Sequence, residues 1–426
     1  MDIVIKQKNS LHGSVTVPGD KSISHRSVMF GAIAKGITEV HGFLLGEDCL
    51  STISCFRKLG ITIELQGETV FVHGKGLHGL SAPTEVLDVG NSGTTLRLMS
   101  GLLAAQPFTS QLTGDASIQK RPMNRVAVCL RQMGASFECA DEDNLHAPFT
   151  IHGKKLKAIE YTLPVASAQV KSALLLAGLY AEGETVVIEP EPTRNHTEIM
   201  LNYMGADITT NGTTIHCRPI SQLYGKRIDV PADISSAAYF MVAGCVCQNA
   251  EILLKNVGIN PTRSGIIDVL LAMGADITIQ NQQTVCGELV GDILVRSSGL
   301  SGTVVEGSLI PRLIDEIPIL AVAACFAKGT TVIRDAAELK VKESNRIHTV
   351  VTELKKFGAS IEETEDGMMI HGGNPLTGCT VETYHDHRIA MAMAVAGIMA
   401  DGETIITNAQ CANISYPAFY ESLLQL

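Results

Sequence analysis

Residues 17–26 read V-P-G-D-K-S-I-S-H-R, and the chain can be interpreted outward from this stretch. Residues 14–17 alternate in polarity as a strand does, and the Pro-Gly pair then ends that strand. Ser22 opens a run that can be helical and is a candidate N-cap. Lys21, Ser22 and Arg26 are therefore expected at a strand-to-helix turn, where free backbone N–H groups favour an anion. Taken alone, this stretch is explained equally well by an ordinary capped turn with solvated cations as by an anion-binding site.

Internal repeats suggest how the rest of the chain is built. The start of this stretch recurs 213 residues later as V-P-A-D at residues 230–233. A second repeat is a glycine between a helical pattern and a short strand, a position typical of a helix C-cap. These glycines, 69 to 84 residues apart, are Gly60, Gly134, Gly205, Gly274 and Gly358. Because 213 is three times 71, close to one repeat, we interpret the chain as two copies of a three-unit block.

Each unit reads as strand, buried helix, strand, amphipathic helix, glycine corner and strand, which predicts an α/β fold. The last unit ends in a predicted helix over residues 417–426, and the N-terminal strands could supply the strand that it lacks. We therefore expect one domain of residues 21–226 and a second, discontinuous domain of residues 1–20 and 227–426. The chain would cross between them twice, and two adjacent crossings make a natural hinge.

Composition narrows the class of protein. A chain of 426 residues with 45% hydrophobic and 18% charged residues is typical of a globular protein with more than one domain. The net charge of −11 argues against broad binding to nucleic acid or a membrane surface. The 11 cysteines include no C-x-x-C pair and indicate reduced thiols, as in the cytoplasm. We see no signal peptide, and the longest uncharged apolar run, residues 389–400, is too short to span a bilayer.

Several other stretches could bind an anion or transfer a proton, although capped turns and solvated charges explain each of them separately. Asp315 begins an apolar helix, where a partly desolvated carboxylate could act as a base. Lys342 and Arg346 are four residues apart and are expected to share a helix face. The pair His385 and His387 has no third ligand nearby, so no metal is expected. The remaining candidate stretches are residues 90–97, 114–125, 167–169 and 193–196.

Seven motifs together closely resemble the 5-enolpyruvylshikimate-3-phosphate synthase family. They are P-G-D-K-S-I-S-H-R (18–26), G-N-S-G-T-T-L-R (90–97), K-R-P-M-N-R (120–125), S-A-Q-V-K-S-A (167–173), D-E-I-P-I-L-A-V-A-A (315–324), V-K-E-S-N-R (341–346) and Y-H-D-H-R-I-A-M (384–391). The resemblance covers essentially the whole chain. It implies a two-domain inside-out α/β barrel, in which each domain has three β-α-β-α-β-β units around buried helices.

The resemblance also implies a reaction of the shikimate pathway, which leads to chorismate and the aromatic amino acids. The enolpyruvyl group of phosphoenolpyruvate moves to the 5-hydroxyl of shikimate 3-phosphate, and phosphate is released by addition and elimination. Asp315 would take the hydroxyl proton, Glu343 would protonate the methylene carbon, and Lys21 would assist. The partners would be these two small molecules, with no cofactor and no metal, and the protein would be a cytoplasmic monomer.

The matching positions divide between the two substrates. Shikimate 3-phosphate would be held by Lys21, Ser22, Arg26, Ser167, Ala168, Gln169, Arg194, Asp315 and Lys342. Phosphoenolpyruvate would be held by Lys21, Gly93, Arg121, Gln169, Arg346 and Arg388. Gly93 also stands where a larger residue is linked to glyphosate tolerance in the family. The chain departs from the family pattern at Ile414, where many members have Lys, and at Glu338, where many have Asn.

Three other functions compete with this one. UDP-N-acetylglucosamine enolpyruvyl transferase shares the fold, but it normally has a Cys in the loop that corresponds to residues 114–125, and none stands there. A metabolite-binding homologue without catalysis would be expected to lack the carboxylates of Asp315 and Glu343. A purely structural repeat array would not need the arginines at positions 26, 121, 346 and 388.

Overall fold

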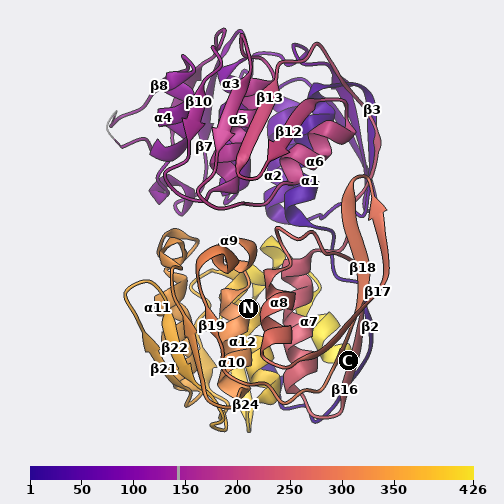
Figure 1. The fold of residues 1–426 in the computed structure, drawn as a ribbon, viewed down its shortest axis with the longest axis vertical. Coiled ribbons are helices and arrows are strands. Elements are labelled where there is room, and N and C mark those ends of the chain that lie inside the picture. The colour runs from indigo at the N-terminus through magenta and orange to yellow at the C-terminus, as the bar shows by residue number, and fades with distance from the viewer. Residues whose placement is uncertain (142–143) are drawn as a thin grey trace. The chain divides into compact units, whose positions relative to one another are not determined.

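The computed structural model describes residues 1–141 and 144–426 and divides into two compact units (Figure 1). Unit 1 contains Met1–Pro18, Pro231–Thr284 and Leu289–Leu426, and unit 2 contains Gly19–Val230 and Val285–Glu288. The chain therefore changes unit after Pro18 and after Val230, where the sequence predicted changes after residues 20 and 226. No sequence signal indicated that residues 285–288 group with unit 2.

The elements of unit 2 follow the repeated order of strands and helices. They are α1 (Lys21–Ile33), β3 (Ala34–His41), α2 (Glu47–Lys58), β4 (Thr62–Gln66), β5 (Thr69–Lys75), β6 (Leu87–Asp88), α3 (Gly93–Ala104), β7 (Thr109–Thr113), the 3₁₀ turn η1 (Ile118–Lys120), α4 (Asn124–Gln132), β8 (Ser136–Glu138), β9 (Phe149–His152), β10 (Glu160–Thr162), α5 (Ala168–Gly178), β11 (Thr185–Ile188), α6 (His196–Tyr203), β12 (Asp207–Asn211), β13 (Thr214–Arg218), β14 (Leu223–Tyr224) and β15 (Arg227–Asp229).

The elements of unit 1 come from both ends of the chain. They are β1 (Ile3–Lys6), β2 (Leu11–Val15), α7 (Ile234–Val246), β16 (Ala250–Gly258), α8 (Gly265–Ala272), β17 (Asp276–Val285), β18 (Glu288–Arg296), β19 (Val304–Val305), η2 (Gly307–Leu309), α9 (Ile310–Leu313), α10 (Ile317–Phe326), β20 (Thr330–Ile333), η3 (Ala337–Val341), α11 (Arg346–Lys356), β21 (Ser360–Glu363), β22 (Met368–His371), β23 (Thr380–Val381), α12 (His387–Met399), β24 (Glu403–Ile406), η4 (Ala409–Ile414) and α13 (Phe419–Gln425).

The sheets repeat one plan, in which two parallel strands are followed by antiparallel partners. In the sheet β6-β7-β9-β8, for example, β6 and β7 are parallel, and β9 is antiparallel to β7 and β8. The described residues of unit 2 also form the sheets β14-β3-β5-β4 and β10-β11-β13-β12. Those of unit 1 form β17-β18-β16-β2, β19-β20-β22-β21 and β1-β24-β23. β1 is antiparallel to β24, so an N-terminal strand supplies the partner that the last repeat lacks.

Three helices lie at the core of each unit and are buried along most of their length, although those of unit 2 also bury polar side chains such as Arg26 and Lys171. In unit 2 these helices are α1, α3 and α5, and in unit 1 they are α7, α10 and α12. Small residues let their backbones approach closely. A Cβ atom on Gly101 of α3 would lie 2.1 Å from the carbonyl oxygen of Ala173 in α5, so only glycine permits this packing. No helix in the described part of the chain is long and apolar enough to cross a membrane.

The predicted glycine corners are confirmed. Each follows an amphipathic helix and has a left-handed φ between +86° and +106°, a conformation that costs glycine little. These corners return the chain from an outer helix to the next strand, and they are Gly60, Gly134, Gly205, Gly274 and Gly358.

Candidate active site

Most of the predicted site residues lie at the N-terminal ends of the buried helices. In unit 2, Lys21 and Ser22 begin α1, Gly93 begins α3, and Ala168 and Gln169 begin α5. Side chains of the N-cap residues accept hydrogen bonds from these helix ends, which aligns the first turns. Helix N-termini carry partial positive charge, which favours a nearby anion.

Two guanidinium groups flank the start of α3. A Cβ atom on Gly93 would lie 2.8 Å from a terminal nitrogen of Arg97 and 2.9 Å from one of Arg121. Gln169 connects α5 to this point, because its amide oxygen accepts a bond from Arg97 (2.8 Å) and its nitrogen donates to Thr94 (3.1 Å). Arg97 was missed as a site residue from the sequence, although its position one helical turn after Gly93 could have indicated it.

At the start of α1, Lys21 and Arg26 have different surroundings. The ammonium group of Lys21 lies 3.1 Å from a carboxylate oxygen of Asp48 and remains partly exposed. Arg26 is buried and donates to Thr197 (2.8 Å) of α6, to Ser172 (3.0 Å) of α5 and to the carbonyl of Ser22 (3.0 Å). Burial lowers the pKa of Arg26 to about 10, although nearby carboxylates oppose the shift, so it remains a cation at neutral pH.

A buried lysine supports the loop that carries Arg194. The ammonium group of Lys171 contacts the carboxylates of Glu189 (2.9 Å) and Glu198 (2.8 Å) and the carbonyl of Thr193 (3.2 Å). Lys171 lies in α5, so these contacts join that helix to the loop before α6. A lysine within a helix that is apolar all round is the sequence signal that could have revealed this network.

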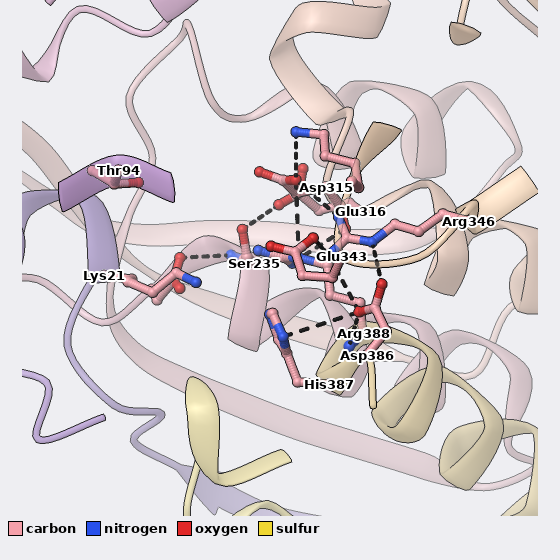
Figure 2. A network of polar contacts seen from close by, with 12 residues as sticks. Lys21, Thr94, Ser235, Asp315, Glu316, Glu343, Arg346, Asp386, His387 and Arg388 are labelled. Carbon is pink, nitrogen blue, oxygen red and sulfur yellow. Dashed lines mark hydrogen bonds and ion pairs between the residues drawn. The ribbon is translucent and has the colours of Figure 1, made fainter. Parts of the chain in front are cut away.

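In unit 1, Arg346 is the centre of a buried charge network (Figure 2). Its guanidinium group bonds to both carboxylate oxygens of Asp386 (2.8 and 3.2 Å), to Glu343 (2.6 Å) and to Asp315 (3.2 Å). Burial by itself would lower the pKa of Arg346, but these carboxylates raise it above the ordinary value. Arg346 is therefore a permanent cation whose orientation three acidic side chains fix.

Asp315 stands two residues before α10 and is surrounded by cations. One of its carboxylate oxygens lies 3.4 Å from the ammonium group of Lys342, 3.2 Å from Arg346 and 3.9 Å from Arg388. Its backbone carbonyl also accepts a bond from Arg388 (3.1 Å). The carboxylate of Asp315 is thus held in place beside three basic groups.

The prediction that Lys342 and Arg346 share a helix face is wrong. Lys342 follows η3 in an extended conformation, and α11 begins only at Arg346, because Asn345 caps that helix with a bond to the N–H of His348. The two cations nevertheless meet at Asp315, because the turn between them brings both side chains to the same carboxylate.

Asp386 and Arg388 lie at the start of α12. Asp386 is fully buried and accepts from the N–H of Arg388 (2.9 Å) while it binds Arg346. Burial opposes the charge of Arg388, but Asp315 raises its pKa above the ordinary value. Of the two departures from the family pattern, Glu338 lies within η3 and Ile414 ends η4, each of them half-buried.

Comparison with known proteins identifies the family. The family model described as EPSP synthase (3-phosphoshikimate 1-carboxyvinyltransferase) matches residues 5–423. The 3-phosphoshikimate 1-carboxyvinyltransferase of Thermoanaerobacter sp. strain X514 is 59% identical over 99% of both chains. That of Desulforamulus reducens is 54% identical over 100% of this chain and 99% of the relative.

A solved structure of EPSP synthase from Acinetobacter baumannii is 48% identical and has a TM-score of 0.89, covering 100% of this chain and 98% of that one. The expected inside-out α/β fold of two three-unit domains is thereby confirmed. With the sequence, the repeat architecture and the relatives in agreement, the chain belongs to the EPSP synthase family.

Proposed function

We propose that this protein transfers the enolpyruvyl group of phosphoenolpyruvate to the 5-hydroxyl of shikimate 3-phosphate and releases inorganic phosphate. The 5-oxygen adds to C2 of phosphoenolpyruvate while a proton reaches the methylene carbon, which gives a tetrahedral intermediate. Loss of phosphate and of a methyl proton then restores the double bond. Atoms and charge balance without a cofactor or a redox step.

The carboxylate of Asp315 beside three cations is the observation that best supports this function. A carboxylate at this place can accept the 5-hydroxyl proton, and Lys342, Arg346 and Arg388 can neutralise anionic substrate groups at the same point. Glu343, bound to Arg346, is assigned as the proton donor to the methylene carbon. Each such proton transfer typically contributes a factor of about 10²–10⁴ in rate.

The helix ends of unit 2 fit the binding roles in the same proposal. We assign Lys21, Gly93, Arg121 and Gln169 to phosphoenolpyruvate, together with Arg346 and Arg388. We assign Lys21, Ser22, Arg26, Ser167, Ala168, Gln169 and Arg194 to shikimate 3-phosphate, together with Asp315 and Lys342. These assignments require residues of both units to contact one pair of substrates, so we also propose that the units close on the substrates.

Phosphate release separates this function from its nearest competitor. The purified protein is incubated with phosphoenolpyruvate and either shikimate 3-phosphate or UDP-N-acetylglucosamine. We expect phosphate with the first acceptor only. Release with the second acceptor alone would assign the competing transferase activity, and release with neither would support a binding homologue.

We further propose that the protein works as a monomer in the cytoplasm. Its cysteines form no disulfide among the described residues, which suits a reducing compartment. Light scattering coupled to gel filtration measures the mass directly, and a mass of about 45 kDa for the 426 residues would support the monomer. A dimer mass at assay concentrations would contradict it.

A further inference from the structure

The turn between β23 and α12 has an unusual backbone for its sequence. Tyr384 and His385 both have left-handed φ angles, +53° and +56°, and the carbonyl of Thr383 accepts from the N–H of Asp386 (2.8 Å). Two consecutive positive φ angles closed by such a bond define a type I′ turn, which strongly favours Gly, Asn or Asp at its centre. Tyr is uncommon at a positive φ, and His, although commoner there than most residues, is not among these three, so contacts elsewhere help to hold this turn.

One helix, α11, holds both sides of the turn. The carboxylate of Glu353, fully buried, accepts from the N–H of Glu382 (3.0 Å) and from the hydroxyl of Tyr384 (2.8 Å). Arg346, seven residues earlier in the same helix, binds Asp386 immediately after the turn. Residues seven apart lie on one face of a helix, so this face contacts the chain both before and after the strained residues.

The Glu353 carboxylate is itself held by a contact with Lys356. The ammonium group of Lys356, one turn further along α11, lies 2.7 and 2.9 Å from its two oxygens. Burial raises the pKa of Tyr384 to about 12, and its bond to Glu353 acts in the same direction, so its hydroxyl remains a donor over the working range of pH.

We propose that Glu353 is a positioning residue that holds the turn of residues 383–386 in its left-handed form and thereby aims Asp386 and Arg388. If the turn relaxed to a commoner conformation, the Asp386 carboxylate would move away from Arg346. The N–H of Arg388 would lose its acceptor, and its side chain would leave the carbonyl of Asp315. Glu353 need not touch a substrate for these effects.

Two variants test the hold on the turn. Glu353→Gln removes the negative charge and one hydrogen-bond acceptor. Tyr384→Phe removes only a hydroxyl group and is the variant that should perturb folding less. The kinetic readout rests on the proposed function. We expect the KM for phosphoenolpyruvate to rise about ten-fold in E353Q and about three-fold in Y384F, with the KM for shikimate 3-phosphate within two-fold of the parent.

A second substitution that relieves backbone strain in the turn can distinguish a positioning role of Glu353 from a general effect on the stability of the protein. His385→Gly makes a left-handed φ easy at an exposed position, so E353Q/H385G should return to within three-fold of the parent KM. The matched control is Asn256→Gly, which relieves a left-handed residue (φ +51°) in β16 of the same unit. Added to E353Q, N256G should leave the raised KM unchanged; rescue by N256G as well as by H385G would overturn the proposal.

Amide hydrogen exchange tests the same idea without any substrate. In E353Q the amides of Glu382 and Asp386 should exchange at least ten-fold faster, while amides at the centre of α12 keep the parent rates. Unchanged exchange at both amides would overturn the positioning role. If the two amides exchange faster in E353Q but the parent protein releases no phosphate, the proposed function is wrong. The proposal that Glu353 holds the turn would then still be supported.

Discussion

Replacing Gly93 with alanine should weaken the binding of phosphoenolpyruvate selectively. The added Cβ would lie 2.8 Å and 2.9 Å from terminal nitrogens of Arg97 and Arg121, whereas ordinary contacts begin near 3.4 Å. Each guanidinium group must therefore retreat by about 0.5 Å. Both are the far ends of flexible side chains, so the helix itself can stay in place.

The size of the effect follows from what the guanidinium groups do. A hydrogen bond to a charged group contributes about 1.5–3 kcal/mol, and a retreat of this size removes about half of one such bond. The loss of about 0.8–1.5 kcal/mol corresponds to a KM for phosphoenolpyruvate raised about four- to twelve-fold. Stability should change by less than about 1 kcal/mol, because alanine is also a better helix former than glycine.

Steady-state phosphate release at varied phosphoenolpyruvate, with thermal unfolding alongside, measures both quantities. The control is Gly101→Ala, whose Cβ would meet the backbone oxygen of Ala173 at 2.1 Å and cannot be accommodated by moving a side chain. That variant should lose about 1–3 kcal/mol of stability. An unchanged KM in G93A, or an equal rise in the KM of both substrates, would refute the reasoning about Arg97 and Arg121.

Three further variants and one scattering measurement test other parts of the protein. Asp315→Ala should lower kcat at least about 100-fold while shikimate 3-phosphate still binds by calorimetry; near-normal kcat would remove Asp315 as the base. Arg121→Ala should raise the KM for phosphoenolpyruvate about ten-fold or more, and an unchanged value would exclude it from that substrate. Lys171→Met strands two buried carboxylates and should cost about 3–5 kcal/mol in urea unfolding, and a loss below 1 kcal/mol would argue that the network is dispensable. X-ray scattering should show a smaller radius of gyration when both substrates are added, and no change would argue against closure.

Much of the fold could be predicted because it repeats. A glycine corner such as Gly134 leaves a local signal, since the left-handed C-cap excludes most other residues, and the five corners together set the length of the unit. The incomplete last unit likewise pointed to a strand from the N-terminus, which β1 supplies. Periodicity is thus informative wherever one local rule is used several times.

The site was harder to predict where it depends on contacts between distant segments. The i,i+4 rule placed Lys342 and Arg346 on one helix, but the cap at Asn345 starts α11 later, and tertiary contacts with Asp315 bring them together. The turn at Tyr384 and His385 was not predicted, because it lacks the Gly, Asn or Asp that usually marks a type I′ turn. The contact of Tyr384 with Glu353, 31 residues earlier, is visible only in the structure.

The pairing of β1 with β24 has a consequence for biosynthesis. Residues 3–6 are translated about 400 residues before their partners at residues 403–406. Domains generally fold as they emerge from the ribosome. Most of unit 2 can therefore fold while β1 of unit 1 still has no partner strand. A nascent chain stalled before residue 400 would therefore carry an unpaired, partly apolar leading segment, the kind of surface that chaperones bind.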